Sequence, residues 1–181
     1  DRDSMIYSDG AGAVVLEASN DSNSGIIAHQ SATFAYDEAH FIYFGESYNQ
    51  ELSDARKYIK MYGRKIYEFA ITNVPSAMKE CLEKAQVPIE EVKKIFIHQA
   101  NEKMDEAIIK RLYKLYGKEA PHDVMPMTID KLGNSSVATV PTVYDLVLNG
   151  QLEGHHVSQG DIVLFASVGA GMNINAIVYR V

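Results

Sequence analysis

Two short polar motifs are the parts of the sequence best suited to chemistry. The first, His98-Gln99-Ala100-Asn101, directly follows the apolar run Ile95-Phe96-Ile97, and the second, Gly133-Asn134-Ser135-Ser136, precedes a helix-like stretch. An imidazole and a carboxamide can each donate a hydrogen bond to one developing oxyanion. Open α/β sheets place their chemistry where strands lead into helices. We therefore expect the side chains of His98 and Asn134 to converge on one pocket, from the carboxyl ends of adjacent parallel strands.

The sequence offers no nucleophile to accompany these two side chains. Its single cysteine, Cys81, falls on the apolar stripe of a helix-like stretch, where a packed thiol is favoured over a reactive one. One cysteine excludes an internal disulfide framework and is compatible with a reducing compartment. The pair His155-His156 has no further ligand at metal spacing, which favours an exposed loop over a metal site. The sequence thus supplies one half of an active site.

The composition of the chain argues against two classes of protein, those that bind nucleic acids and those that span a membrane. The chain has 181 residues, of which 46% are hydrophobic, enough for a buried core. Its net charge of -7, without a block of basic residues, argues against nucleic-acid binding, which needs a basic face. No apolar run approaches the roughly 20 residues of a membrane span, and no signal peptide is visible. We expect a cytoplasmic protein. Because the sequence begins with Asp-Arg-Asp, we also expect that its first residue is not the native start.

Hydrophobic periodicity predicts an alternation of strands and helices. The expected strands are 13–18, 25–34, 92–97, 124–129, 161–168 and 173–181, and the expected helices are 63–86, 101–117 and 135–149. Pro75 should kink the first helix. Residues 35–60, rich in tyrosine, are interpreted as a long loop with a short helix. From residue 25 onward this order predicts an α/β fold, with a five-stranded mixed sheet covered by helices on both faces.

Several motifs together resemble the C-terminal half of a ketoacyl-ACP synthase III of the thiolase superfamily. They are Ser8-Asp9-Gly10-Ala11-Gly12-Ala13-Val14-Val15-Leu16, Met61-Tyr62-Gly63-Arg64, Ile97-His98-Gln99-Ala100-Asn101, Gly133-Asn134-Ser135-Ser136 and Val168-Gly169-Ala170-Gly171. That family resembles a duplication of two similar halves in a thiolase-like layered fold. The resemblance implies that residues 1–24 hold the last strand of an otherwise missing N-terminal half, which would carry the acyl-accepting cysteine. Residues 25–181 would form the C-terminal domain.

The resemblance implies a decarboxylative Claisen condensation in fatty-acid or related biosynthesis. A cysteine takes an acyl group from a thioester, and the carbanion left when a malonyl thioester loses CO₂ attacks the acyl-cysteine. His98 and Asn134 would donate hydrogen bonds to the oxyanion formed on decarboxylation, each lowering the barrier by about 3 kcal/mol. His98 could also activate the cysteine. The backbone N–H near Ala170, between Gly169 and Gly171, would bind the oxygen of the acyl carbonyl.

The resemblance also implies partners. They are acyl-CoA or acyl-carrier-protein thioesters, the carrier protein itself, held with the help of Lys103, and a second copy in a homodimer; no cofactor, metal, nucleic acid or membrane is expected. Glu68 stands where relatives often have a basic residue, which Arg64 and Lys65 could compensate. The segment 43–62 is expected to pack, with a role as an acyl-pocket wall as the alternative.

Three other functions stay open on the sequence. They are a non-decarboxylating acyltransferase, a synthase of the hydroxymethylglutaryl type, and a non-catalytic partner subunit. Whichever holds, this chain alone is expected to be inactive, because it lacks a plausible acyl-accepting cysteine.

Overall fold

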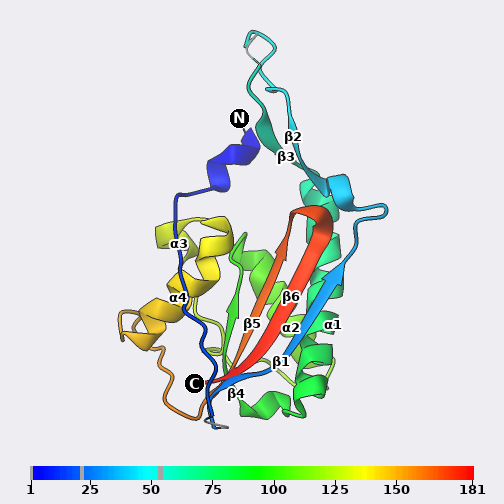
Figure 1. Ribbon diagram of the computed structural model, residues 1–181. Coiled ribbons are helices and arrows are strands. Elements are labelled where there is room, and N and C mark those ends of the chain that lie inside the picture. Colours follow the sequence, from blue (N-terminus) through cyan, green and yellow to red (C-terminus); the bar gives the residue numbers. More distant parts are fainter. Residues whose placement is uncertain (1, 21–22, 53–54) are drawn as a thin grey trace.

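The main element of the fold is a four-stranded mixed sheet in the order β1-β6-β5-β4. The computed structural model describes residues 2–20, 23–52 and 55–181. Its strands are β1 (Gly25–Thr33), β2 (Ile42–Gly45), β3 (Tyr58–Met61), β4 (Val92–Ile97), β5 (Ile162–Gly169) and β6 (Asn173–Arg180). Its α-helices are α1 (Gly63–Ala85), α2 (Glu102–Lys114), α3 (Ile129–Leu132) and α4 (Thr139–Leu148) (Figure 1). Strands β4 and β5 are parallel, whereas β6 runs antiparallel to both β5 and β1.

Alternating side chains give the sheet two buried faces. Along β5, Leu164 and Ala166 belong to the larger hydrophobic core, which also contains the apolar sides of α1 and α2. Val163 and Phe165, which point the opposite way because side chains alternate along a strand, pack in a second cluster with α4. The prediction of helices on both faces is therefore confirmed.

The two long helices begin and end close to the predicted residues. Asn101 caps α2, its Oδ1 accepting a hydrogen bond from the backbone N–H of Met104 at 3.2 Å, as its residue type favours. Helix α1 runs unbroken through Pro75, which is buried. None of the helices in the described ranges is long and apolar enough to cross a membrane.

The prediction of five strands in the main sheet is wrong, because residues 124–129 do not form a strand. This segment runs past β4 and makes one ladder-like contact there, in which the N–H of Ile95 donates to the carbonyl of Val124 at 2.8 Å. Pro126 lies inside the segment and has no N–H to donate, so a regular ladder cannot continue.

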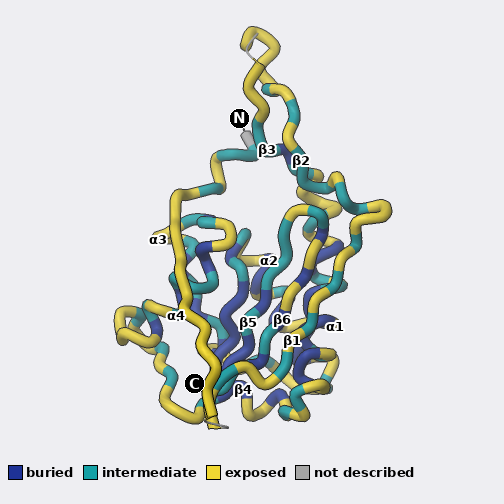
Figure 2. The backbone as a smooth tube through the Cα atoms, in the orientation of Figure 1, coloured by how far each residue is buried: buried dark blue, intermediate teal, exposed yellow. Residues whose placement is uncertain are grey.

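Two further expectations about strands and loops are corrected. Residues 35–60 are not one long loop, since β2 and β3 pair as an antiparallel hairpin that projects from the end of the molecule (Figure 1). Residues 13–18 form no strand. Instead, residues 8–20 pass along α4 as an exposed extended segment (Figure 2).

Candidate functional site

His98 follows β4 directly, and its imidazole is fixed by one backbone group. Its Nδ1 lies 3.1 Å from the carbonyl oxygen of Ser136, and because a carbonyl can only accept, Nδ1 carries the proton. Burial lowers the pKa of His98 below its usual value, and the bond to Ser136 opposes this shift more weakly. The ring is therefore neutral near pH 7, with Nε2 as a hydrogen-bond acceptor. The expectation that this ring simply donates to an oxyanion holds only once Nε2 is protonated.

Asn134 is buried, and its carboxamide orientation is set by the same residue. The backbone N–H of Ser136 donates to Oδ1 of Asn134 at 2.9 Å, so Nδ2 is the end of the amide that can donate to a ligand. Ser136 thus holds both side chains, one through its carbonyl and the other through its N–H. It does so with φ at +56°, a left-handed conformation that a residue other than glycine rarely adopts.

The backbone of Asn134 is held by the N-terminal part of the chain rather than by a strand of the main sheet. The N–H of Asn134 donates to the carbonyl of Ile6 at 3.1 Å, and its carbonyl accepts from the N–H of Ser8 at 2.9 Å. Together they form an isolated parallel bridge between Tyr7 and Asn134. The expectation that Asn134 ends a strand adjacent to that of His98 is therefore wrong, because it follows the short helix α3 and Gly133.

His98 and Asn134 nevertheless line one cavity of about 450 Å³. Gly169 and Ala170, after β5, lie on the same cavity, and residues of the β2–β3 hairpin, including Tyr43 and Phe44, form part of its wall. Gly171 and Lys103 are not among the residues that line it. Most of the other lining side chains are aliphatic or aromatic, so the cavity suits an apolar chain that ends in a polar group.

The turn after β5 carries Ala170 without backbone strain. Gly171 and Met172 have positive φ values of 73° and 51°, whereas Ala170 is not among the described residues with positive φ. The side-chain Nδ2 of Asn173 donates to the carbonyl of Ala170 at 3.0 Å and closes the turn. Alanine at this position therefore leaves a backbone N–H in place at no conformational cost.

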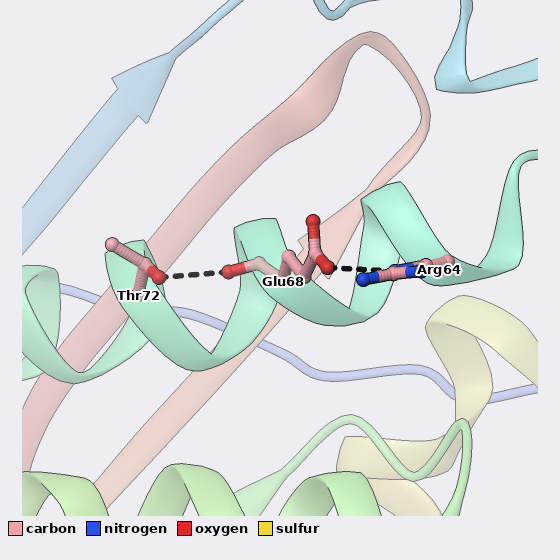
Figure 3. Close-up of polar contacts among 3 residues, drawn as sticks. All are labelled: Arg64, Glu68 and Thr72. Carbon is pink, nitrogen blue, oxygen red and sulfur yellow. Dashed lines mark hydrogen bonds and ion pairs between the residues drawn. The ribbon is translucent and has the colours of Figure 1, made fainter.

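Two positive residues, Arg64 and Lys65, and one negative residue, Glu68, lie near the start of α1. Nε of Arg64 lies 2.9 Å from Oε1 of Glu68, one turn along the helix, and the carbonyl of Glu68 accepts from the hydroxyl of Thr72 (Figure 3). Nζ of Lys65 lies over the rings of Phe41 and Tyr62, at 5.2 and 5.5 Å from their centroids. Arg64 therefore offsets the charge of Glu68 locally, and Lys65 adds one positive charge beside the pair. Lys103 is exposed on α2.

The remaining candidate residues behave as structural groups. Cys81 is buried between α1 and the sheet, where its thiol contacts the carbonyl oxygens of Ala28 and Ala176. Burial raises the pKa of this thiol, which opposes the formation of a nucleophilic thiolate. His155 is half-buried rather than fully exposed, and burial lowers its pKa. In the described part of the chain, no group of three or more His, Cys, Asp or Glu side chains could hold a metal ion.

Three residues that organise the site had no assigned role on the sequence. They are Ser8, Gln99 and Ser136, which bond to His98, to Asn134 or to the segment before Asn134. Apart from the bond between Ser136 and Asn134, these contacts join residues far apart in the sequence. Ser8, Gln99 and Ser136 lie within the quoted motifs. A sequence pattern shows such a residue but does not reveal its partner.

Comparison with known proteins identifies what the chain is similar to. Residues 82–181 match the family model described as 3-oxoacyl-[acyl-carrier-protein (ACP)] synthase III C terminal. The chain is 32% identical to a beta-ketoacyl-[acyl-carrier-protein] synthase III from Novosphingobium aromaticivorans over 98% of this chain and 52% of that protein. It is 30% identical to one from Aquifex aeolicus, over 97% of this chain and 50% of that protein. The chain thus spans about half the length of these relatives.

A solved structure agrees with these sequence matches. The crystal structure of 3-oxoacyl-[acyl-carrier-protein] synthase III from Aquifex aeolicus superposes with a TM-score of 0.71 and 27% identity, covering 91% of this chain and 46% of that one. The expected thiolase-like α/β fold is therefore confirmed, with four strands in the main sheet and a separate hairpin.

Proposed function

Because the chain belongs to the 3-oxoacyl-[acyl-carrier-protein] synthase III C-terminal family, we propose that it supplies the oxyanion-stabilising half of a condensing enzyme's active site. The observation that carries this proposal is the shared attachment of His98 and Asn134 to Ser136 at the wall of one cavity. This arrangement points Nδ2 of Asn134 and Nε2 of His98 away from the protein contacts that fix the other end of each group.

The proposed reaction is the decarboxylative condensation of a malonyl thioester with an acyl group held on a cysteine outside this chain. The bond between the malonyl carbon and its carboxylate breaks, CO₂ leaves, and the electron pair moves onto the thioester oxygen. Nδ2 of Asn134 donates to that oxygen. The carbanion then forms a carbon–carbon bond to the carbonyl carbon of the acyl-cysteine, and the cysteine leaves as a thiolate. His98 can act in both stages, since a neutral Nε2 accepts a proton from a thiol and a protonated Nε2 donates to an oxyanion. The backbone N–H of Ala170 donates a hydrogen bond to the oxygen of the acyl carbonyl.

The substrates we propose are acyl-CoA or acyl-carrier-protein thioesters. The apolar walls of the cavity, including the β2–β3 hairpin, would hold an acyl chain or the arm of its carrier. Lys103 lies outside the cavity on an exposed face, so its proposed role is limited to contact with the carrier protein. A cytoplasmic homodimer is part of the same proposal.

The full-length protein that contains this chain allows a direct test of the role of Asn134. Asn134→Ala should slow malonyl decarboxylation by about 100-fold, the usual loss for one oxyanion donor, and should change acyl transfer to the cysteine far less. Asn149→Ala, at the exposed end of α4, is the control and should change neither half-reaction. Equal losses in both half-reactions for Asn134→Ala would refute the assigned role.

The isolated 181-residue chain provides a second test. Incubation with radiolabelled acyl thioesters should leave it unlabelled, because its cysteine is buried with a raised thiol pKa. A stable acyl group on Cys81, located by peptide mapping, would refute the proposal that the acyl-accepting cysteine lies outside this chain.

A further inference from the structure

Gln99 sits beside His98 with its side chain turned into the protein. It is 1% exposed, and both ends of its carboxamide are hydrogen-bonded to the segment that leads to Asn134. Nε2 donates to the carbonyl of Pro126 at 2.8 Å, and Oε1 accepts from the backbone N–H of Thr128 at 2.9 Å and from its hydroxyl at 3.1 Å. A buried amide bonded at both its oxygen and its nitrogen fixes the geometry of the segment that it binds.

A short chain of backbone bonds continues from Thr128 to the site. The carbonyl of Thr128 accepts from the N–H of Leu132 at 2.9 Å, and that of Ile129 accepts from the N–H of Gly133 at 3.0 Å. Gly133 is followed directly by Asn134. Thr128, which is hydrogen-bonded to Gln99, is therefore connected to Asn134 by the hydrogen-bonded turn of α3 and Gly133. The position of Thr128 thus constrains the position of Asn134.

We propose that Gln99 is a positioning residue that sets the Asn134 amide against the His98 imidazole; this inference rests on the proposed function. His98 and Gln99 are neighbours at the end of β4, one facing the cavity and the other holding the Asn134 segment. Through Gln99, the segment that carries Asn134 is therefore attached to the end of β4, which also carries His98. Loss of its amide leaves the Pro126 carbonyl and the Thr128 N–H unpaired in a buried place, a cost that the segment relieves by shifting.

Gln99→Met in the full-length protein tests this inference, because methionine keeps the volume and removes both hydrogen bonds. We expect malonyl decarboxylation to slow by about 10- to 100-fold, the scale of a misplacement near 1 Å, with a much smaller change in acyl transfer to the cysteine. Lys94→Met is the matched control. Lys94 is equally buried on β4, and its Nζ donates to the backbone carbonyl of Asp123 and pairs with the Asp123 carboxylate at 2.9 Å. Because it makes no bond to Pro126 or Thr128 in the described structure, we expect both half-reactions of Lys94→Met to stay near wild type even if the lost ion pair lowers stability.

A double variant separates positioning from general destabilisation. If Gln99 acts through Asn134, Gln99→Met should slow decarboxylation no further in a background of Asn134→Ala. Multiplied losses in the double variant, or equal losses of both half-reactions in Gln99→Met, would overturn the inference.

Crystal structures of the full-length variants give a readout that needs no reaction. They should show Asn134 displaced from the N–H of Ser136 in Gln99→Met and in place in Lys94→Met. If the wild type failed to decarboxylate malonyl thioesters, the proposed function would be wrong. If Asn134 kept its position in Gln99→Met, only the positioning role of Gln99 would be wrong.

Discussion

Asp105 is a buried carboxyl group on the first turn of α2. Neither Oδ1 nor Oδ2 has a hydrogen-bond partner within normal distance among the described residues. Burial raises the pKa of this carboxyl to about 8; the nearby backbone of Asn101 opposes the shift, and Glu102 and Glu106 add to it. In the unfolded chain the same group titrates near its ordinary value of about 3.9. Asp105 is therefore protonated in the folded protein at pH values where it is ionised in the unfolded chain.

This difference predicts a pH-dependent loss of stability. Between about pH 4 and pH 8 the folded state binds more protons than the unfolded state, so the free energy of unfolding should fall as the pH rises and level off above about pH 8. Asp105→Asn, which cannot ionise, should abolish most of this slope and raise stability at pH 8 by a few kcal/mol, on the order of the cost of a buried unpaired charge.

Urea unfolding of the chain at several pH values measures the effect. Glu106→Gln is the control because Glu106 is exposed on the next position of α2 and makes the smallest contribution to the pKa shift of Asp105, so most of the wild-type slope should remain. A slope that survives in Asp105→Asn would show that other groups cause it.

At the scale of single residues, sequence reasoning found the two side chains but not the way they are held. The residue types of His98 and Asn134 were enough to predict that both side chains line one cavity, and their role as oxyanion donors stays a prediction. Their common dependence on Ser136 could not be predicted, since it relies on a left-handed backbone at a residue that is not glycine. Such a conformation is imposed by tertiary contacts and leaves no local pattern.

At the scale of elements, residues 8–20 pack closely at two glycines, Gly12 against α4 and Gly10 against the turn that precedes α4. A Cβ at Gly12 would lie 2.4 Å from Cγ of Pro141, and one at Gly10 would lie 2.7 Å from Cβ of Ser135. Since Pro141 is a ring with little freedom, the backbone would have to move. The N–H of Ser8, in the same segment, donates to the carbonyl of Asn134. The packing of this segment therefore also helps to position Asn134.

Gly12→Ala should therefore loosen the segment from α4. We expect a destabilisation of about 1 to 3 kcal/mol, as for overpacking elsewhere, and faster proteolytic cleavage within residues 9–20. Gly63→Ala is the control, because a Cβ at Gly63 meets nothing within 4 Å at the start of α1, where alanine favours the helix. Equal cleavage rates in the two variants would show that the contact with Pro141 does not hold the segment.

The elements that sequence reasoning placed well are those with a strong internal period. Helices α1 and α2 carry their apolar pattern over their whole length, and β4, with its apolar run Ile95-Phe96-Ile97, was predicted residue for residue. The segment 124–129 has strand-like residues, but Pro126 prevents regular pairing, and the β2–β3 hairpin has tyrosines without clear alternation. Whether each of these segments forms a strand depends on the backbone segment that lies beside it. The local sequence does not determine which segment that is.

At the scale of the whole molecule, the chain leaves apolar surface uncovered along one side. Val14, Val15 and Leu16 are 74%, 94% and 78% exposed in the segment that runs beside α4 (Figure 2). The backbone of these residues pairs with no strand of the described structure. Contiguous exposed apolar residues on an extended segment favour association with another chain.

We therefore predict that the isolated chain self-associates through this segment, to a dimer in the simplest case. Sedimentation at micromolar concentration should give a mass above that of the 20.1 kDa chain. Val15→Asp should shift it to the monomer without loss of fold, because this side chain makes almost no contacts within the chain. Phe44→Asp places the same charge on another exposed apolar residue, in the β2–β3 hairpin, and should leave association unchanged. A wild-type chain that sediments as a monomer would refute the prediction, and an equal effect of both substitutions would assign the association to general hydrophobicity rather than to the segment beside α4.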